Sequence, residues 1–452
     1  MNSCLCRMDM ERLHLLFNPV EGALFSSDGY SRRDLVDMAA RILAAAANHH
    51  PTALCIATDN RAVIAAALLA ALVGGPQLLL PHSFSRNALE ELRGQTGFTA
   101  ALAGGSAVDL TPGITMIDPV SAPSATFSMS VPIELHKPLL TIFTGGSTGR
   151  PRLWQKTGAN IFGEAMVLAR HFAIGANERI LATVPPLHIY GLLFSVVLPM
   201  VAGGMVVADT LSFPADIESA IRARGVTVLV AVPAHYRAMR HHPPRNCAPR
   251  LAFSSAGPLA AEDGRAFRDS TGTGVIEIYG STETGGIAVR NRSRGQKGFV
   301  ALPGVDWQIR EGRLAVRSAW LSPGLTTDQD GFFHTADRVE PLDNGFMLRG
   351  RVDGVAKVGG KRVDLEEVRQ HLLGYAGVED CAVMALPETS GRGMRICALV
   401  QGQPIDTRSL QSGLGRTLEP AALPKTIVRV DRIPMRQNGK YDRQAILRLL
   451  MT

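Results

Sequence analysis

Segments with helical spacing of apolar residues alternate with short, continuous apolar runs along most of this chain. Between residues 30 and 110, the spacing of apolar residues predicts helices over 32–49 and 60–73, and short apolar runs predict strands over 53–58 and 77–80. The alternation resumes at residue 157 and continues to residue 279. Alternation of this kind is typical of parallel strands joined by helices. We therefore predict an α/β fold in which helices flank parallel-type sheets.

The pattern changes after Gly285, where short strands and turns replace the alternation. From residue 351 onward, helices over 363–373 and 440–450 and strands over 378–386 and 396–400 form a compact α+β pattern. The chain has 452 residues, which exceeds one typical domain. We expect a large N-terminal domain, 1–350, that includes a β-subdomain, and a small, mobile C-terminal domain, 351–452.

Charge and apolar content restrict the partners. The formal net charge is +7, which favours anionic partners such as a nucleotide, CoA or an acidic carrier protein. The sequence contains no dense Lys/Arg block of the kind that would predict nucleic-acid binding. The apolar runs 62–80 and 191–208 are interrupted by glycine and proline, so each predicts a buried helix followed by a buried strand rather than a membrane span. A polar N-terminus and six scattered cysteines favour a cytoplasmic protein with reduced thiols.

A loop built only of Thr, Ser and Gly follows an apolar strand that ends near Phe143. Backbone N–H groups in such a loop can approach phosphate oxygens closely, hydroxyls add hydrogen bonds, and basic residues just beyond it supply positive charge. A flexible surface loop is the competing interpretation, and the absence of a Lys-Ser/Thr pair after Gly149 excludes a Walker loop. The predicted polyphosphate-binding residues are Thr144, Gly145, Gly146, Ser147, Thr148, Gly149, Arg152 and Lys156.

A second stretch, 276–286, places an aromatic ring, hydroxyls and one carboxylate at the end of a predicted strand. Open α/β sheets bind ligands at the carboxyl ends of their parallel strands. Tyr279 could stack on a purine, and Glu283 could hold Mg²⁺ through oxygen. The alternative is a glycine-punctuated turn with a surface glutamate.

Three other segments are ambiguous by themselves. His188 and Tyr190 precede an apolar helix, where a lone histidine is more often a satisfied core residue. Asp337 could accept hydrogen bonds from ribose hydroxyls, with Arg351 as a donor beside it, although both segments are also typical of ordinary turns with exposed charges. Lys440 follows a glycine in a tight turn, where a lysine is usually a solvated charge.

The order of these segments resembles the adenylate-forming superfamily, which includes acyl- and aryl-CoA synthetases, firefly luciferase and the adenylation domains of peptide synthetases. The resemblance covers about two thirds of the chain by ordered motifs. The motifs are Thr-Gly-Gly-Ser-Thr-Gly-x-Pro (144–151), Pro-Leu-His-Ile-Tyr-Gly (186–191), Ser-Ser-Ala-Gly-Pro-Leu (254–259), Tyr-Gly-Ser-Thr-Glu-Thr (279–284), Thr-Ala-Asp (335–337), Gly-Arg-Val-Asp (350–353) and Asn-Gly-Lys (438–440).

The resemblance implies a two-step reaction. A carboxylate attacks the α-phosphorus of MgATP, which gives an acyl-adenylate and pyrophosphate, and a thiol of CoA or of phosphopantetheine on an acyl carrier protein then displaces AMP. Such a site must neutralise phosphate charge and hold the carboxylate in line. A protein of this kind is an AMP-forming acid–thiol ligase whose cofactors are ATP and Mg²⁺.

The resemblance also implies residue roles. Thr144, Ser147 and Thr148 would surround the β- and γ-phosphates. The other implied contacts are Thr282 and Lys440 to the α-phosphate, Glu283 to the metal, Tyr279 to the adenine, and Asp337 and Arg351 to the ribose. Gly280 and Ser281 would bind the cofactor and also line the acid pocket. The residues implied to contact the acid are His188, Tyr190, Gly191, His235, Ser255, Ala256 and Gly257, with His188 also counted as catalytic. Asp353 matches the hinge about which the small domain rotates, and Gly359 and Gly360 match the thiol tunnel.

The chain departs from the family pattern at three points. Arg152 replaces the usual loop lysine, and the two side chains are not interchangeable in geometry. The region before residue 140 is short, which predicts a shortened first subdomain. Ala336 replaces the usual glycine before Asp337, a change that we expect to be tolerated.

No acidic residue lies beside His188, which disfavours an α-amino acid and favours an aryl or medium-chain, fatty-acid-like acyl substrate in an apolar pocket. Two alternatives stay open. One is an enzyme that forms the acyl-adenylate without free CoA as the acceptor. The other is a non-catalytic nucleotide-binding homologue that acts as a sensor or scaffold. Retention of Glu283, Asp337 and Lys440 together argues against the second alternative.

Overall fold

The computed structural model describes residues 13–17, 19–104, 112–123, 125, 132–144, 152–245, 247–358, 361–388, 394–404, 406–415, 417–436 and 439–451. These residues divide into two compact units. Unit 1 comprises the described residues within Met1–Lys297, Ala301–Asp306 and Arg317–Thr326. Unit 2 comprises those within Gly298–Val300, Trp307–Val316 and Thr327–Thr452. The domain boundary predicted near residue 350 lies inside unit 2 and stays a prediction.

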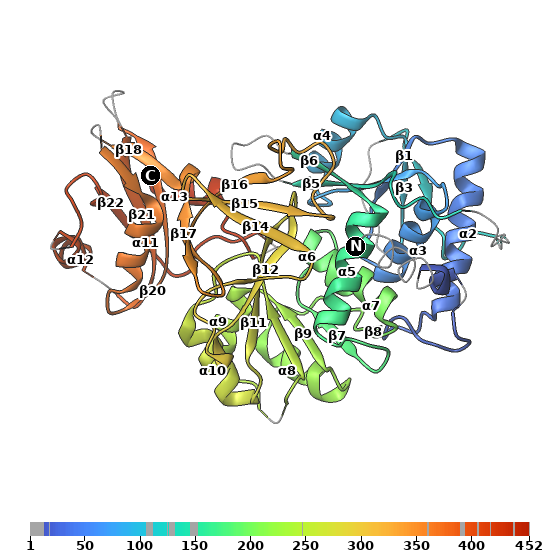
Figure 1. Cartoon of the computed structure of the whole chain (residues 1–452), viewed down its shortest axis with the longest axis horizontal. Coiled ribbons are helices and arrows are strands. Elements are labelled where there is room, and N and C mark those ends of the chain that lie inside the picture. The colour runs from blue at the N-terminus through green and yellow to red at the C-terminus, as the bar shows by residue number, and fades with distance from the viewer. Residues whose placement is uncertain are drawn as a thin grey trace. The chain divides into compact units, whose positions relative to one another are not determined.

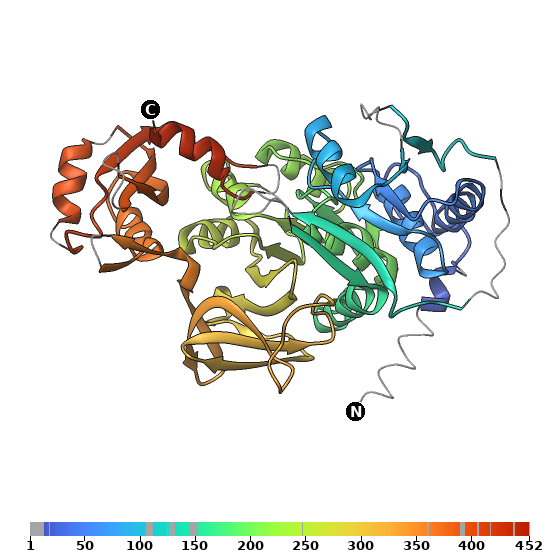
Figure 2. The same cartoon turned by 90° about the horizontal axis from the view of Figure 1, so that it is seen from above.

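Unit 1 contains a six-stranded sheet in the order β4-β3-β1-β2-β5-β6. Five neighbouring strands are parallel and only β6 is antiparallel to its neighbour. The strands are β1 (Ala53–Ile56), β2 (Gln77–Leu80), β3 (Ala100–Leu102), β4 (Thr115–Ile117), β5 (Pro138–Thr144) and β6 (Arg152–Thr157). Figure 2 shows β5 and β6, in teal, as a long hairpin.

Three helices accompany this sheet, namely α2 (Arg32–His49), α3 (Arg61–Leu72) and α4 (Arg86–Thr96). Side-chain caps fix where they begin. Ser31 and Asp34 form a capping box at α2, and the Asn60 side chain accepts hydrogen bonds from two N–H groups at the start of α3. Every residue of α3 except Ala71 is buried, which agrees with its almost uniformly apolar sequence.

A second sheet, all of which except Val300 belongs to unit 1, has seven strands in the order β13-β12-β11-β10-β9-β7-β8. The run from β8 to β11 is parallel, and β12 returns antiparallel to β11. Figure 1 shows helices beside this sheet. The strands are β7 (Arg179–Ala182), β8 (Met205–Val206), β9 (Val228–Ala231), β10 (Leu251–Ser254), β11 (Val275–Ser281), β12 (Gly285–Asn291) and β13 (Val300–Ala301), and the helices include α5 (Gly158–His171), α8 (Pro214–Ala223), α9 (Pro233–His241) and α10 (Ala261–Thr271).

Both apolar runs fold as predicted into a buried helix followed by a strand. The first gives α3 and β2. The second gives α6 (Ile189–Leu192), a π-helical turn over Leu193–Val197, α7 (Leu198–Ala202) and β8. Within the described ranges, no helix is long and apolar enough to cross a membrane.

Unit 2 holds most of a four-stranded sheet, β14 (Val305–Arg310), β15 (Arg313–Ser318), β16 (Phe333–Leu342) and β17 (Gly345–Arg351), and then a hairpin of β18 (Val355–Val358) and β19 (Lys361–Asp364). A three-stranded sheet follows, built of β20 (Val378–Pro387), β21 (Met394–Gly402) and β22 (Thr426–Val430). Alternate residues of β20 and β21 enter two different cores. One core includes α11 (Leu365–Leu373) and α12 (Thr407–Leu414), and the other includes α13 (Arg443–Met451), so helices cover both faces.

The predicted α/β fold class is confirmed, and the structure adds or corrects several local details. Residues 152–157 form strand β6, so the Gly-rich loop joins two antiparallel strands, and α5 begins only at Gly158, where Thr157 caps it. Asp337 and Arg351 lie in paired strands rather than in turns. Helix α11 begins at Leu365 instead of 363, because Asp364 ends β19 and caps the helix.

Candidate functional site

The predicted site residues of unit 1 cluster by topology at the carboxyl edge of the seven-stranded sheet. Strands β7, β9, β10 and β11 are parallel neighbours, so their carboxyl ends meet at one edge. His188 follows β7, His235 follows β9 and Ser255 follows β10. Tyr279 lies near the carboxyl end of β11. This edge is where open α/β sheets bind ligands.

Aromatic and imidazole side chains line the part of the edge predicted to hold the acid. His188 is half-buried at the N-cap of α6, and the half-buried His235 ring lies 2.7 Å from the Thr183 hydroxyl through Nδ1. Tyr190 is buried and donates its hydroxyl to the Ala231 carbonyl at 3.3 Å. Burial raises the pKa of Tyr190, so this phenol stays a donor.

Two small residues here have backbone positions that larger side chains would not tolerate well. A Cβ on Gly191 would lie 2.0 Å from the Pro185 carbonyl oxygen, so only glycine fits where the helix meets the preceding loop. Ala256 has φ of 71°, a left-handed conformation that is unfavourable for alanine. The neighbouring Ser255 hydroxyl donates to the Ile278 carbonyl at 2.9 Å and joins the ends of β10 and β11. Gly257 is exposed in the same loop.

A tight turn connects β11 to β12 and carries Thr282 and Glu283. Ser281 and Thr284 stabilise it, because each backbone N–H donates to the other residue's hydroxyl, at 3.1 and 3.2 Å. A Cβ on Gly280 would lie 2.2 Å from the Gly285 carbonyl oxygen, so this hairpin requires glycine. Tyr279, Thr282 and Glu283 are half-buried.

Lys156 is buried beneath this turn. Its side chain is 1% exposed, and its ammonium donates to the carbonyl oxygens of Glu283 at 3.3 Å and Trp320 at 2.9 Å. Burial lowers the pKa of Lys156 to about 8, against the opposing effect of the Glu164 and Glu283 carboxylates. Its two hydrogen-bond partners therefore lie on the protein backbone, and its predicted contact with phosphate stays a prediction.

The Gly-rich loop lies between β5 and β6. Thr144 ends β5 and pairs in register with Arg152 of β6, whose side chain is exposed. The predicted phosphate-binding residues Gly145, Gly146, Ser147, Thr148 and Gly149 lie outside the described residues.

Unit 2 carries the remaining predicted residues. Asp337 and Arg351 are register partners in β16 and β17, and the Arg351 Nη1 lies 3.4 Å from an Asp337 carboxylate oxygen. Asp353 lies in a short 3₁₀ turn, Val352–Gly354, directly before β18. Lys440 is exposed, and its carbonyl accepts a hydrogen bond from the Arg436 N–H at 2.8 Å. Gly359 and Gly360 are not among the described residues.

Glu283 is the carboxylate predicted to contact a metal. Among the described side chains, no group of three or more His, Cys, Asp and Glu could hold a metal ion. A single carboxylate such as Glu283 suits Mg²⁺ that is bound together with a nucleotide, because Mg²⁺ takes one or two carboxylates plus phosphate oxygens and keeps several waters.

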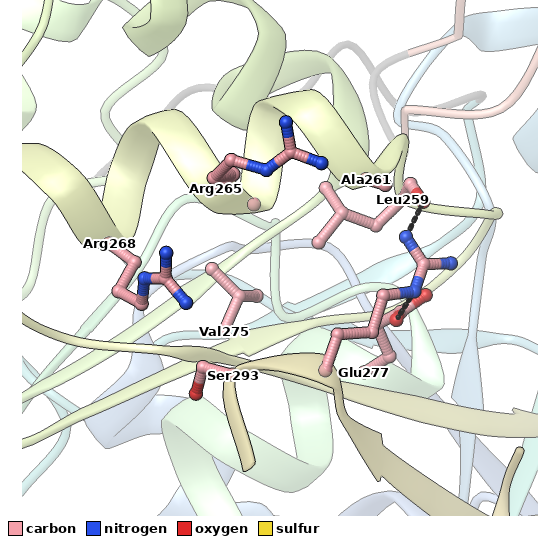
Figure 3. A pocket seen from close by; sticks show the side chains of 9 residues that line it. Leu259, Ala261, Arg265, Arg268, Val275, Glu277 and Ser293 are labelled. Carbon is pink, nitrogen blue, oxygen red and sulfur yellow. Dashed lines mark hydrogen bonds and ion pairs between the residues drawn. The ribbon is translucent and has the colours of Figure 1, made fainter. Parts of the chain in front are cut away.

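A cavity of about 170 Å³ lies between α10 and β11 (Figure 3). Arg265 and Arg268 come from α10, and Glu277 forms part of the β11 side. Glu277 binds Arg290 at 2.8 and 2.9 Å and Arg292 at 3.2 Å. On β11 the cavity is lined by Val275 and Glu277, and Tyr279, the predicted adenine contact, is not part of its lining.

Sequence analysis missed two residues beneath the turn, Glu164 and Trp320. Glu164 is buried in α5 and accepts the Gly286 N–H at 2.7 Å, and burial raises the pKa of its carboxyl. Trp320 donates its indole N–H to the Gly286 carbonyl at 2.8 Å. One signal was available, since Glu164 interrupts an otherwise apolar helix face and a buried carboxylate needs partners.

Comparison with known proteins decides the family. The model of the AMP-binding enzyme family matches residues 33–317, and the model of the AMP-binding enzyme C-terminal domain matches residues 367–440. The chain belongs to the AMP-binding enzyme family. The predicted resemblance is thereby confirmed, and this AMP-binding enzyme has both parts that the family models describe.

Several of its relatives are CoA ligases or CoA synthases by name. The human mitochondrial malonate–CoA ligase is 27% identical over 69% of this chain, and the chain spans 66% of that protein. A feruloyl-CoA synthase from an Amycolatopsis species is 26% identical over 69% of each chain. The structure of ATP-bound MatB from Rhodopseudomonas palustris matches with a TM-score of 0.81 and 20% identity, over 96% of this chain and 98% of that one, and so shares the fold.

Proposed function

We propose that this AMP-binding enzyme activates a carboxylic acid with ATP and transfers the acyl group to a thiol. The observation that carries the proposal is the convergence of His188, His235, Ser255 and the Thr282–Glu283 turn at the carboxyl edge of one sheet, in a chain of this family. The named CoA ligases among its relatives support the same reaction.

In the first step, a carboxylate oxygen attacks the α-phosphorus, the bond to the β-phosphate oxygen breaks, and pyrophosphate leaves. The Thr282 hydroxyl would donate to the α-phosphate, and the Tyr279 ring would lie against the adenine. Bound Mg²⁺, held by Glu283 and the phosphates, would supply charge neutralisation. Asp337 would accept hydrogen bonds from ribose hydroxyls, with Arg351 as a donor beside it, and the Lys440 ammonium would bridge the carboxylate and the α-phosphate.

In the second step, a thiolate sulfur attacks the acyl carbonyl carbon and AMP leaves. We infer CoA as the acceptor because the named relatives use it. An acyl carrier protein, which presents the same thiol on phosphopantetheine, is the alternative acceptor. The resemblance assigns this step to a second arrangement of the small domain about Asp353.

The acid is aryl or medium-chain acyl in this proposal. Tyr190 and Phe194 stack edge to face with centroids 5.2 Å apart, and Phe253 lies 5.1 Å from Phe194. These rings are buried, so the protein interior close in sequence to the predicted His188 contact is apolar and aromatic. An aromatic or alkyl acid gains more from such surroundings than a short diacid does.

The test is carboxylate-dependent ATP–pyrophosphate exchange with benzoic, cinnamic, medium-chain aliphatic and malonic acids, with and without Mg²⁺. We expect Mg²⁺-dependent exchange with one aryl or aliphatic class and none in Lys440→Ala. Exchange with malonate alone would overturn the proposed acid class. ATP binding without exchange for any acid would favour the sensor alternative instead.

A further inference from the structure

We propose that Lys156 is a positioning residue, which holds the turn carrying Thr282 and Glu283 from inside the protein together with Glu164, rather than a ligand of phosphate. The inference rests on the proposed function, because the turn it positions is the one assigned to the α-phosphate and the metal. Nothing in the sequence distinguishes this role from direct phosphate binding.

The first support is the geometry at the Glu283 backbone. Its carbonyl oxygen accepts hydrogen bonds from the Lys156 ammonium at 3.3 Å and from the Ser322 N–H at 2.8 Å. The same ammonium donates to the Trp320 carbonyl at 2.9 Å, so it joins the turn to segment 320–322. A backbone carbonyl held by two donors fixes the direction in which the Glu283 side chain leaves the chain.

The second support is the other end of the turn. Glu164 accepts the Gly286 N–H, and Trp320 donates to the Gly286 carbonyl. Gly285 has φ of +66°, and a Cβ there would lie 2.5 Å from a Trp320 ring carbon and 2.6 Å from a Glu164 carboxylate oxygen. The Glu283 end of the turn is therefore held by Lys156, and the Gly286 end is held by Glu164 and the Trp320 indole.

The third support is where these side chains originate. Lys156 lies in β6, the strand that follows the Gly-rich loop in sequence, and Glu164 lies in α5, the next element. The segment predicted to bind the β- and γ-phosphates thus continues directly into the residues that hold the turn assigned to the α-phosphate. One continuous segment, β6 and α5, is then connected both to the predicted phosphate loop and to the turn assigned to the α-phosphate. Catalysis is sensitive to small displacements of such groups.

The test compares two variants with wild type. Lys156→Met leaves Glu164 buried without its cation, so this variant is expected to be the less stable one. Lys156→Met with Glu164→Gln removes both charges and keeps an oxygen that accepts the Gly286 N–H. The control is Arg290→Met with Glu277→Gln, which removes a buried ion pair from the strands that flank the turn, and in which Arg292 also loses its contact with Glu277. Each variant is measured for its urea midpoint, for Mg²⁺-dependent exchange and for deuterium uptake over 279–287.

We expect the double variant to regain most of the urea midpoint and still to lose about 10–100-fold in kcat for exchange. We also expect a higher Mg²⁺ requirement, a KM for the acid within about twofold, and faster deuterium uptake at the turn. The control should keep its Mg²⁺ requirement. Wild-type kinetics and uptake in the double variant would overturn the inference. No exchange in wild type would instead overturn the proposed function, while deuterium uptake would still decide whether Lys156 holds the turn.

Discussion

At the scale of single residues, Glu283 is engaged through two different groups. Its backbone carbonyl is held by Lys156 and Ser322, and its half-buried carboxylate is the predicted metal contact. A carboxylate side chain attached to a fixed backbone loses less conformational entropy when it binds a cation than one attached to a mobile backbone.

We predict that Glu283→Gln raises the Mg²⁺ concentration for half-maximal exchange by at least about tenfold, since an amide oxygen is a weaker ligand for a hard cation than a carboxylate. Titration of exchange against Mg²⁺ measures this. Glu178→Gln, which changes a carboxylate paired with Arg250 and assigned no role in the site, serves as the comparison. An unchanged Mg²⁺ titration in Glu283→Gln would contradict the metal assignment.

The pH dependence of stability gives a second residue-scale prediction. Burial lowers the pKa of Lys156 to about 8 from an ordinary value of 10.5. Between these two pH values the unfolded chain binds more protons at this amine, so the free energy of unfolding rises with pH, by at most about 1.4 kcal/mol per unit. Urea unfolding from pH 8 to 10 should therefore show wild type gaining stability relative to Lys156→Met with Glu164→Gln. A difference that falls or stays constant would contradict the burial of a charged amine.

At the scale of elements, the turn that carries Lys440 is anchored by the next residue. The half-buried Tyr441 donates its hydroxyl to an Asp380 carboxylate oxygen at 2.6 Å, and Arg369 donates to both, at 3.3 Å to Asp380 and 3.2 Å to Tyr441. Met435 and Tyr441 also form an isolated β-bridge. Lys440 therefore projects from a turn whose base is a buried hydrogen-bond network.

We predict that Tyr441→Phe lowers the free energy of unfolding by about 1.5–3 kcal/mol, because the hydrogen bond that it removes ends on a charged group. Exchange should fall, whereas thioester formation from a supplied acyl-adenylate should stay within about twofold, since Lys440 is assigned only to adenylation. The control is Tyr375→Phe, which removes an exposed hydroxyl that donates to the Ser409 carbonyl. An equal loss in both half reactions would contradict the role of this anchor.

Sequence reasoning recovered the elements whose own pattern specifies them. Helix α2 and strand β2 match the predicted ranges residue for residue, because Ser31 marks the helix start and glycine and proline precede the strand. Strand β6 was missed because the apolar residues of Arg152–Thr157, Leu153 and Trp154, are adjacent, so the segment lacks the apolar alternation that identifies a strand. The same reason applies to Asp337 in β16, where pairing with β17 sets the conformation.

The candidate site was predicted only as far as its motifs extend. Motifs indicated Tyr279, Glu283 and Lys440, but no local pattern indicates that Lys156 and Glu164, eight positions apart, meet a turn more than a hundred residues later. Such contacts arise from the pairing of whole sheets and helices. Burial of charge is a tertiary property, and the sequence alone left Lys156 as one more cation near a phosphate loop.

At the scale of the whole molecule, the predicted residues are divided between two units. Unit 1 carries the carboxyl-edge residues and the turn, and unit 2 carries Asp337, Arg351, Asp353 and Lys440. The resemblance implies that one chain completes two half reactions by reorienting its small domain about Asp353.

We predict that Asp353→Pro separates the half reactions, because proline fixes φ near −65° and removes the N–H at the proposed hinge. One half reaction should slow by at least about tenfold while the other changes by less than about threefold. Exchange reports the first, and thioester formation from a supplied acyl-adenylate reports the second. Asp343→Pro, in the exposed β16–β17 turn, is the control. Equal effects on both half reactions would contradict the hinge.

The most direct test of the central claim is the product balance. Purified protein is incubated with ATP, Mg²⁺, CoA and the acid selected by exchange, and the products are quantified by mass spectrometry. We expect AMP, pyrophosphate and acyl-CoA in equal amounts, all lost in Lys440→Ala. Formation of ADP and phosphate, or consumption of ATP without a thioester when CoA and a phosphopantetheine-bearing carrier protein are both supplied, would contradict it.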